Sequence, residues 1–169
     1  MPGPPTDDEG TALVVVPTTD YLWFVDLALD QMHAIVEDLG DELVNRRPPF
    51  RDTNSAYVIL THCLGVMEYW GGATVAQRPI QRDRAAEFTA SGDVAGLLRR
   101  SEQARRRLRE DLVGLHAEDQ PVNVRRDPDE PVPYTETKGA VLLHVLEELF
   151  QHLGQMELTR DALVASRRR

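Results

Sequence analysis

The sequence predicts an all-α protein, a four-helix bundle with one long loop between its third and fourth helices. Four long segments repeat apolar residues at the 3.6-residue spacing of amphipathic helices, and no segment shows the period-two alternation of a strand. Stretches rich in proline or glycine separate these segments. With 169 residues, 41% of them hydrophobic, the chain can form one domain with a full-sized core.

The first helix is expected from about residue 18 to Leu39, where Gly40 would end it. Its apolar positions follow the helical period: Leu22, Val25, Leu29, Met32, Val36 and Leu39. Residues 1–17 precede it and are rich in proline and acidic residues. We expect this segment to be a disordered or loosely attached arm, and residues 18–169 to form the bundle.

The second helix is expected to begin at Thr53 or Asn54, because the prolines just before it cannot be helical. It runs to Trp70, with a weaker continuation through two glycines to Gln77. The arginine-rich residues 78–89 are interpreted as a loop.

The third helix is expected from Val94 to about Leu115, with a strongly charged middle that we interpret as a solvated face. Residues 117–136 contain four prolines and are expected to form the long loop. This loop is either a functional lid or a connection with no function of its own. The fourth helix follows, from about Thr137 to Ser166.

The composition argues against several classes of partner. A net charge of -9 disfavours nucleic acid and anionic membrane surfaces, and no apolar run is long enough to span a bilayer. The N-terminus lacks the apolar core of a signal peptide, so a cytoplasmic location is expected. Cys63 stands alone and is expected to be a small core residue, whereas His33 is expected at the surface.

The fourth helix carries His144, Glu148 and His152 at intervals of four, so all three lie on one face among apolar residues. Burying such groups requires a partner, either a divalent cation or a hydrogen-bond network. The second helix offers one inward candidate, His62. A set of His, Glu and His with open positions is typical of a catalytic zinc site.

His144 competes with His62 for the role of third ligand. The two histidines of the fourth helix are, however, about 12 Å apart along its axis, too far for one ion to bind both easily. His144 is therefore interpreted either as a supporting residue beside the ligands or as a packed, hydrogen-bonded core histidine.

Three stretches of the chain resemble the DinB-like superfamily: HVLEELFQHLGQMELTRDAL (144–163), LTHCLGVMEYW (60–70) and RPIQRDRAAEF (78–88). The resemblance is to the actinobacterial branch, which is related to mycothiol-dependent maleylpyruvate isomerase and to thiol S-transferases. It implies a DinB-like four-helix bundle, often dimeric, with one divalent metal bound by His62, Glu148 and His152. Glu148 stands where many relatives have a third histidine.

The resemblance also implies a function. A divalent metal, zinc or alternatively nickel, would activate a low-molecular-weight thiol such as mycothiol for attack on a small electrophile. Tyr69, Trp70 and His144 are expected to contact the substrate, with simple core packing as the alternative for Tyr69. Arg82 and Arg84 would either hold a carboxylate or form surface ion pairs. A homodimer is expected. The alternative is a non-catalytic bundle with a structural or vestigial metal site, acting as a binding or stress-response protein.

Overall fold

The computed structural model describes residues 15–124 and 135–167. Among these residues the regular structure is entirely helical, which confirms the all-α prediction. Residues 1–14 of the expected arm and residues 125–134 of the expected long loop lie outside the described residues. Within the described ranges, no helix combines the length and the apolar character needed to cross a bilayer.

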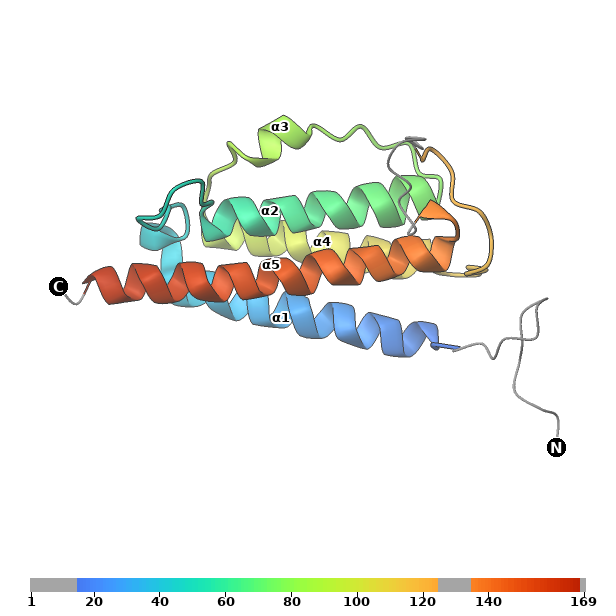
Figure 1. Cartoon of the computed structure of the whole chain (residues 1–169), viewed down its shortest axis with the longest axis horizontal. Helices are drawn as coiled ribbons and strands as arrows, with labels where there is room; N and C mark the ends of the chain where they lie inside the picture. Colours follow the sequence, from blue (N-terminus) through green and yellow to red (C-terminus); the bar gives the residue numbers. More distant parts are fainter. Residues whose placement is uncertain (1–14, 125–134, 168–169) are drawn as a thin grey trace.

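Long helices lie side by side around one hydrophobic core (Figure 1). They are α1 (Thr18–Leu43), α2 (Ala56–Val66), α4 (Val94–Asp111) and α5 (Lys138–Arg167). The last helix packs against both α1 and α2, so residues near the start and the end of the chain share the core. This packing brings the inward faces of α2 and α5 together.

The first helix buries the predicted apolar face, with Val25, Leu29 and Met32 fully buried. Gly40 adopts a φ of +58°, which glycine tolerates, so the helix kinks there and continues to Leu43. The surface position expected for His33 is wrong. Its side chain is 14% exposed, and Nε2 lies 2.7 Å from Oγ of the buried Ser101 on α4.

The second helix is the most deeply buried of the set, since each of its residues except Gly65 is buried. Ser55 caps its first turn and accepts a hydrogen bond from the Val58 amide at 3.3 Å. The helix therefore begins slightly later than the sequence indicates. Because it is apolar on all sides, the one histidine it carries, His62, is held inside the protein.

A π-helix, η1 (Met67–Val75), continues α2 through the two glycines. At Gly71 an added Cβ would lie 2.6 Å from Cδ1 of Leu108, so the missing side chain lets α4 approach closely. Gly71 therefore allows close packing between η1 and α4. The helical path extends beyond Trp70, as expected. Segments of this kind are frequent at functional sites.

The interpretation of residues 78–89 as a loop is wrong in one part, because a one-turn helix, α3 (Arg84–Glu87), forms within it. Asp83 caps this turn and accepts a hydrogen bond from the Ala86 amide at 3.0 Å. Figure 1 shows α3 lying over α2. Its last residue, Glu87, is buried.

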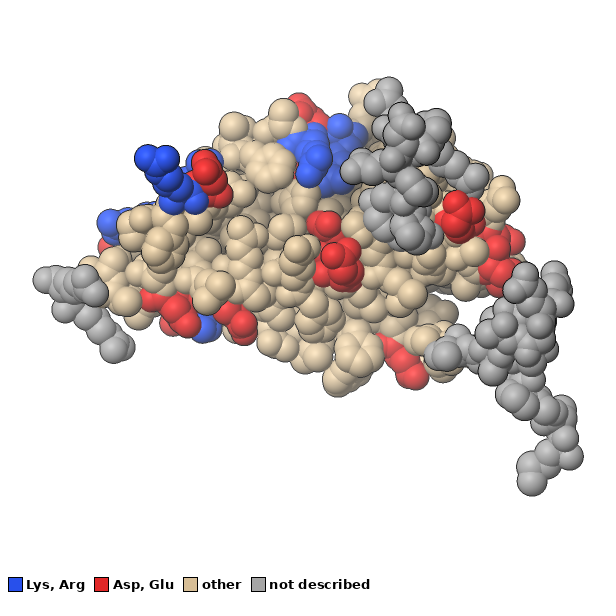
Figure 2. Space-filling model, viewed as in Figure 1, with Lys and Arg blue, Asp and Glu red and all other residues tan. Residues whose placement is uncertain are grey.

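The charged run of α4 is only partly solvated. Arg105 pairs with Asp30 at 2.5 Å, and Arg109 pairs with Asp26, which ties α4 to α1. Such pairs each contribute little free energy. On the face shown in Figure 2, the Lys and Arg side chains of the described residues form separate groups rather than one continuous patch.

Candidate metal centre

The three residues expected to hold a metal meet where α2 faces α5. Oε2 of Glu148 lies 3.4 Å from Nε2 of His62 and 3.3 Å from Nε2 of His152. One potential ligand atom from each residue lies within 4.8 Å of the other two. Glu148 and His152 approach each other because they are four residues apart on one face of α5. His62 approaches Glu148 because α2 is buried against α5.

These residues fit a divalent transition metal. Two ligand atoms of a tetrahedral zinc ion, each about 2.0–2.1 Å from it, are about 3.3 Å apart. The two measured distances from Oε2 of Glu148, 3.4 and 3.3 Å, agree with that separation. Two imidazoles and one carboxylate are also the ligand types of a catalytic zinc site that leaves a further position open.

Both histidines have an acceptor at their other ring nitrogen. Nδ1 of His62 lies 2.8 Å from Oε2 of Glu87, and Nδ1 of His152 lies 2.9 Å from Oε1 of Gln155. Nε2 of each ring is thereby directed toward Glu148. Metal-binding histidines in proteins are commonly oriented in this way.

The contacts within the centre favour the ionised form of Glu148 and the protonated form of His152. Hydrogen bonding with His152, and next with His62, holds the pKa of Glu148 well below its usual range, although burial opposes this shift. The hydrogen bond with Glu148 is also the main reason that the pKa of His152 is raised. In the absence of a metal the same groups can therefore stabilise one another.

His144 lies beside the centre. Its Nε2 is 4.0 Å from Oε1 of Glu148, whereas the other two histidines pair with Oε2, and its Nδ1 is 2.9 Å from Oε2 of Glu147. The ring also packs edge-on against Trp70, with centroids 5.4 Å apart. These contacts agree with a supporting position and not with a shared ligand set that includes His152.

The other predicted site residues lie around this centre with different partners. The rings of Tyr69 and Trp70 pack edge to face, 5.0 Å apart, and the Arg82 guanidinium lies 5.8 Å from the Tyr69 centroid. Arg82 also makes two hydrogen bonds to Glu87, at 2.6 and 2.9 Å. Arg84 is exposed, and its guanidinium lies 5.9 Å from the centroid of the Phe88 ring.

Glu87, Phe88 and Gln155 are functional candidates that the sequence alone does not identify. Phe88 stacks on the imidazole of His62, with ring centroids 5.4 Å apart. The sequence does contain a signal for α3, because Asp83 is a typical N-cap residue and two alanines follow at positions 85 and 86. The contact of Glu87, the last residue of α3, with His62 cannot be predicted without the tertiary fold.

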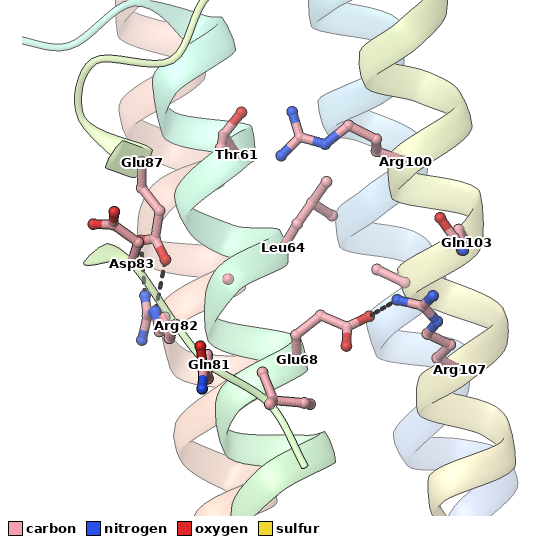
Figure 3. Close-up of a pocket in the computed structure, with 13 residues that line it drawn as sticks. Thr61, Leu64, Glu68, Gln81, Arg82, Asp83, Glu87, Arg100, Gln103 and Arg107 are labelled. Atoms are coloured by element: carbon pink, nitrogen blue, oxygen red, sulfur yellow. Dashed lines mark hydrogen bonds and ion pairs between the residues drawn. The ribbon is translucent and has the colours of Figure 1, made fainter. Parts of the chain in front are cut away.

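A cavity of about 300 Å³ lies between α2, α4 and the segment that leads into α3. Figure 3 shows Arg82 paired with Glu87 along one wall and Arg107 of α4 paired with Glu68 along another. Glu87 lines this cavity, whereas His62 does not. Cys63 is fully buried as expected, and burial raises the pKa of its thiol, which makes it unsuited to be a nucleophile.

The sequence matches a known protein family. The sequence model of one family, described as mycothiol-S-transferase, matches residues 22–165 and so includes every helix that carries the centre. No curated protein and no solved structure matches the chain. The match spans most of the sequence and agrees with the resemblance to mycothiol-related DinB-like proteins. The chain belongs to the mycothiol-S-transferase family.

Proposed function

We propose that this protein is a divalent-metal-dependent enzyme that activates the thiol of mycothiol for attack on a small electrophile, so that mycothiol becomes bonded to the electrophile through its sulfur. The observation that carries the proposal is the convergence of His62, Glu148 and His152 within 4.8 Å, inside a chain of the mycothiol-S-transferase family. The family supports mycothiol as the thiol substrate, and a metal bound by the three residues would activate that thiol. A DinB-like arrangement of the bundle and a cytoplasmic location are also part of the proposal.

The three ligands would hold zinc or, alternatively, nickel. When bound, such an ion acts as a Lewis acid that lowers the pKa of a thiol toward neutrality and favours its nucleophilic form. In the overall transfer, a sulfur–carbon bond forms, the bond between carbon and the leaving group breaks with its electron pair, and the thiol proton passes to solvent. Glu148 would contribute a negative charge that offsets that of the cation.

The protein's own side chains would bind and orient the two reactants. Tyr69, Trp70 and Phe88 form an aromatic surround that suits an apolar electrophile. His144 packs against Trp70 and would contact the substrate at the centre. Arg84 is exposed beside Phe88 and suits a carboxylate on either reactant, while Arg82 would contribute together with its partner Glu87.

A homodimer is also part of the proposal. Exposed rings lie together across α1 and α5, where Trp23 packs on Phe24 and Phe24 packs on Phe150. Trp23 is 58% exposed and Phe24 45%. Aromatic side chains exposed in a group are typical of protein interfaces. Sedimentation of wild type and Trp23→Ser would test this, because a dimer formed through these rings should weaken in the variant.

The first test is the metal content of protein purified without chelators or a histidine tag, measured by mass spectrometry. We expect about one ion per chain in the wild type and a strong loss in His62→Ala and Glu148→Gln. His116→Ala, at a side chain 73% exposed, and Glu157→Gln, at an exposed position of α5, serve as matched controls.

The second test is turnover with mycothiol and the electrophile monochlorobimane, before and after metal removal. Metal-dependent conjugation that is lost in His62→Ala would support the proposal. Metal bound without turnover across several electrophiles would favour the alternative, a non-catalytic bundle with a structural or vestigial site. A wild-type protein that neither contains nor takes up a metal would contradict the metal-dependent function.

A further inference from the structure

We propose that Glu87 is a positioning residue for His62, which holds the imidazole hydrogen at Nδ1 and so directs the lone pair of Nε2 toward Glu148 and His152. The inference rests on the proposed function, since it concerns how the chain prepares its metal ligand. It assigns a role to a buried acid outside the ligand set, and to the short helix α3 that carries it.

The contact itself is specific. Oε2 of Glu87 lies 2.8 Å from Nδ1 of His62, and both side chains are only 8% exposed. A carboxylate can only accept here, so this contact favours a hydrogen on Nδ1. Phe88, the next residue, stacks on the same imidazole and restricts its rotation.

Arg82 holds the acid in place from the other side. Its Nε and Nη2 donate to the two oxygens of Glu87 at 2.6 and 2.9 Å, a bidentate geometry that fixes the plane of the carboxylate. Figure 3 shows this pair standing beside α2. Nη2 of Arg82 is also 3.3 Å from Nδ1 of His62, so a competing arrangement exists in which Nδ1 accepts from Arg82. Glu87 is nearer, at 2.8 Å, and it favours the donor form of Nδ1.

The backbone of α2 makes room for the acid. Gly65 lies one helical turn after His62, and a Cβ added there would be 2.7 Å from Cδ of Glu87. The carboxylate could move away only by giving up its bonds to Arg82 and His62. The glycine, the arginine and the cap of α3 therefore act together to bring one carboxylate to Nδ1.

The first test compares zinc affinity, by competition with a chromophoric chelator, in wild type, Glu87→Gln and Glu87→Met. Loss of such a partner typically weakens metal binding by about 10- to 100-fold. We expect that loss in Glu87→Met and a smaller one in Glu87→Gln, whose amide oxygen still accepts from Nδ1. Glu102→Gln is the matched control, because it removes an acid 3.7 Å from the unrelated His33.

A space-filling role for Glu87 predicts a different result, since methionine fills the same volume. If Glu87→Met bound zinc as tightly as the wild type, the proposal would be overturned. Circular dichroism of each variant shows whether it is folded. Should Glu87→Met not fold, the graded loss in Glu87→Gln decides the question, and unchanged affinity there would equally contradict the proposal.

The second test moves the acid without removing it. Gly65→Ala should weaken zinc binding about as much as Glu87→Met, although Glu87 is still present. Gly154→Ala on α5 is the control, because a Cβ at Gly154 meets nothing within 4 Å. Equal zinc affinity in the two alanine variants would show that the position of the carboxylate is unimportant.

The third test reads the position of the hydrogen directly and needs no metal. Long-range ¹H–¹⁵N spectra of the full-length, chelator-treated protein should place a hydrogen on Nδ1 of His62 in the wild type and lose it in Glu87→Met. A wild-type spectrum with no hydrogen on Nδ1 would favour the arrangement with Arg82 and overturn the proposal. If the wild type takes up no zinc, the proposed function fails, whereas this spectrum still decides the role of Glu87.

Discussion

Glu148 on α5 and His62 on α2 meet across the bundle, with 3.4 Å between the carboxylate Oε2 and the imidazole Nε2. His152 approaches the same oxygen at 3.3 Å, and His144 faces the other oxygen at 4.0 Å. The carboxylate of Glu148 thus has three imidazoles around it. Without a cation, hydrogen bonds from the imidazoles stabilise the carboxylate, and this stabilisation is strongest when the imidazoles are protonated.

The stability of the metal-free protein should therefore depend on pH through Glu148 and His152. The lowered pKa of Glu148 adds stability above its unfolded value of 4.5, which is lost as the pH falls through the folded value. The raised pKa of His152 adds stability below 6.5, which is lost as the pH rises through the folded value. We expect the melting-temperature difference between chelated wild type and Glu148→Gln to be largest between about pH 4.5 and 6.5. A difference that does not vary with pH would contradict this.

Zinc should stabilise the wild type against heat, because an ion that binds only the folded state shifts the equilibrium toward it. At a free concentration of 100 times Kd the gain is about 2.7 kcal/mol. The expected result is a melting temperature that rises with added zinc and falls back with chelator. His62→Ala should show no such rise, while His116→Ala should behave as the wild type. An equal rise in both variants would mean that zinc binds elsewhere.

The C-terminal part of α5 should contribute to stability through its buried face only. Leu163 is 1% exposed, whereas Leu158, on the same helix, is 71% exposed. Leu163→Ala should lower the free energy of unfolding by about 2–5 kcal/mol, since it leaves a cavity in the core. Leu158→Ala should change it by less than about 0.5 kcal/mol. Urea denaturation measures both, and similar losses would be inconsistent with the orientation of the helix.

Cys63 should be chemically inert in the folded protein. It is fully buried, and burial raises the pKa of its thiol, so little thiolate is available to react. An aromatic disulfide reagent should label it slowly under native conditions and completely in guanidinium chloride. Fast native labelling, at a rate near that of a free thiol, would show that the thiol is accessible. The inert thiol also means that thiol reactivity in a transfer assay comes from the added co-substrate.

The metal-binding residues are the part of the site that a sequence can indicate. A helix of regular geometry places Glu148 and His152 on one face, whatever surrounds it. The apolar residues on all sides of His62 show that its helix is buried. The resemblance to DinB-like proteins then selects these three from the available histidines and acids, and the structure brings their ligand atoms together.

The residues that contact Nδ1 of His62 could not be predicted from the sequence in this way. Glu87 is 25 positions away, on a one-turn helix whose path is set by its packing on α2. Nothing in the sequence around Arg82 shows whether this arginine binds a substrate or pairs with an acidic residue of the protein. His33 illustrates the same limit, because a residue at the border of an apolar face can point to solvent or to a neighbouring helix. Its contact with Ser101 depends on where α4 lies.

The close approach of Gly65 and Glu87 has a consequence for the evolution of the family. A chain that acquires a side chain at position 65 has no room for a glutamate at position 87 in its present place. The two positions should therefore vary together among relatives, as residues in spatial contact often do. Members that retain the acid should retain the glycine. Lineages that have lost the glycine should have replaced the acid and found another way to orient the histidine.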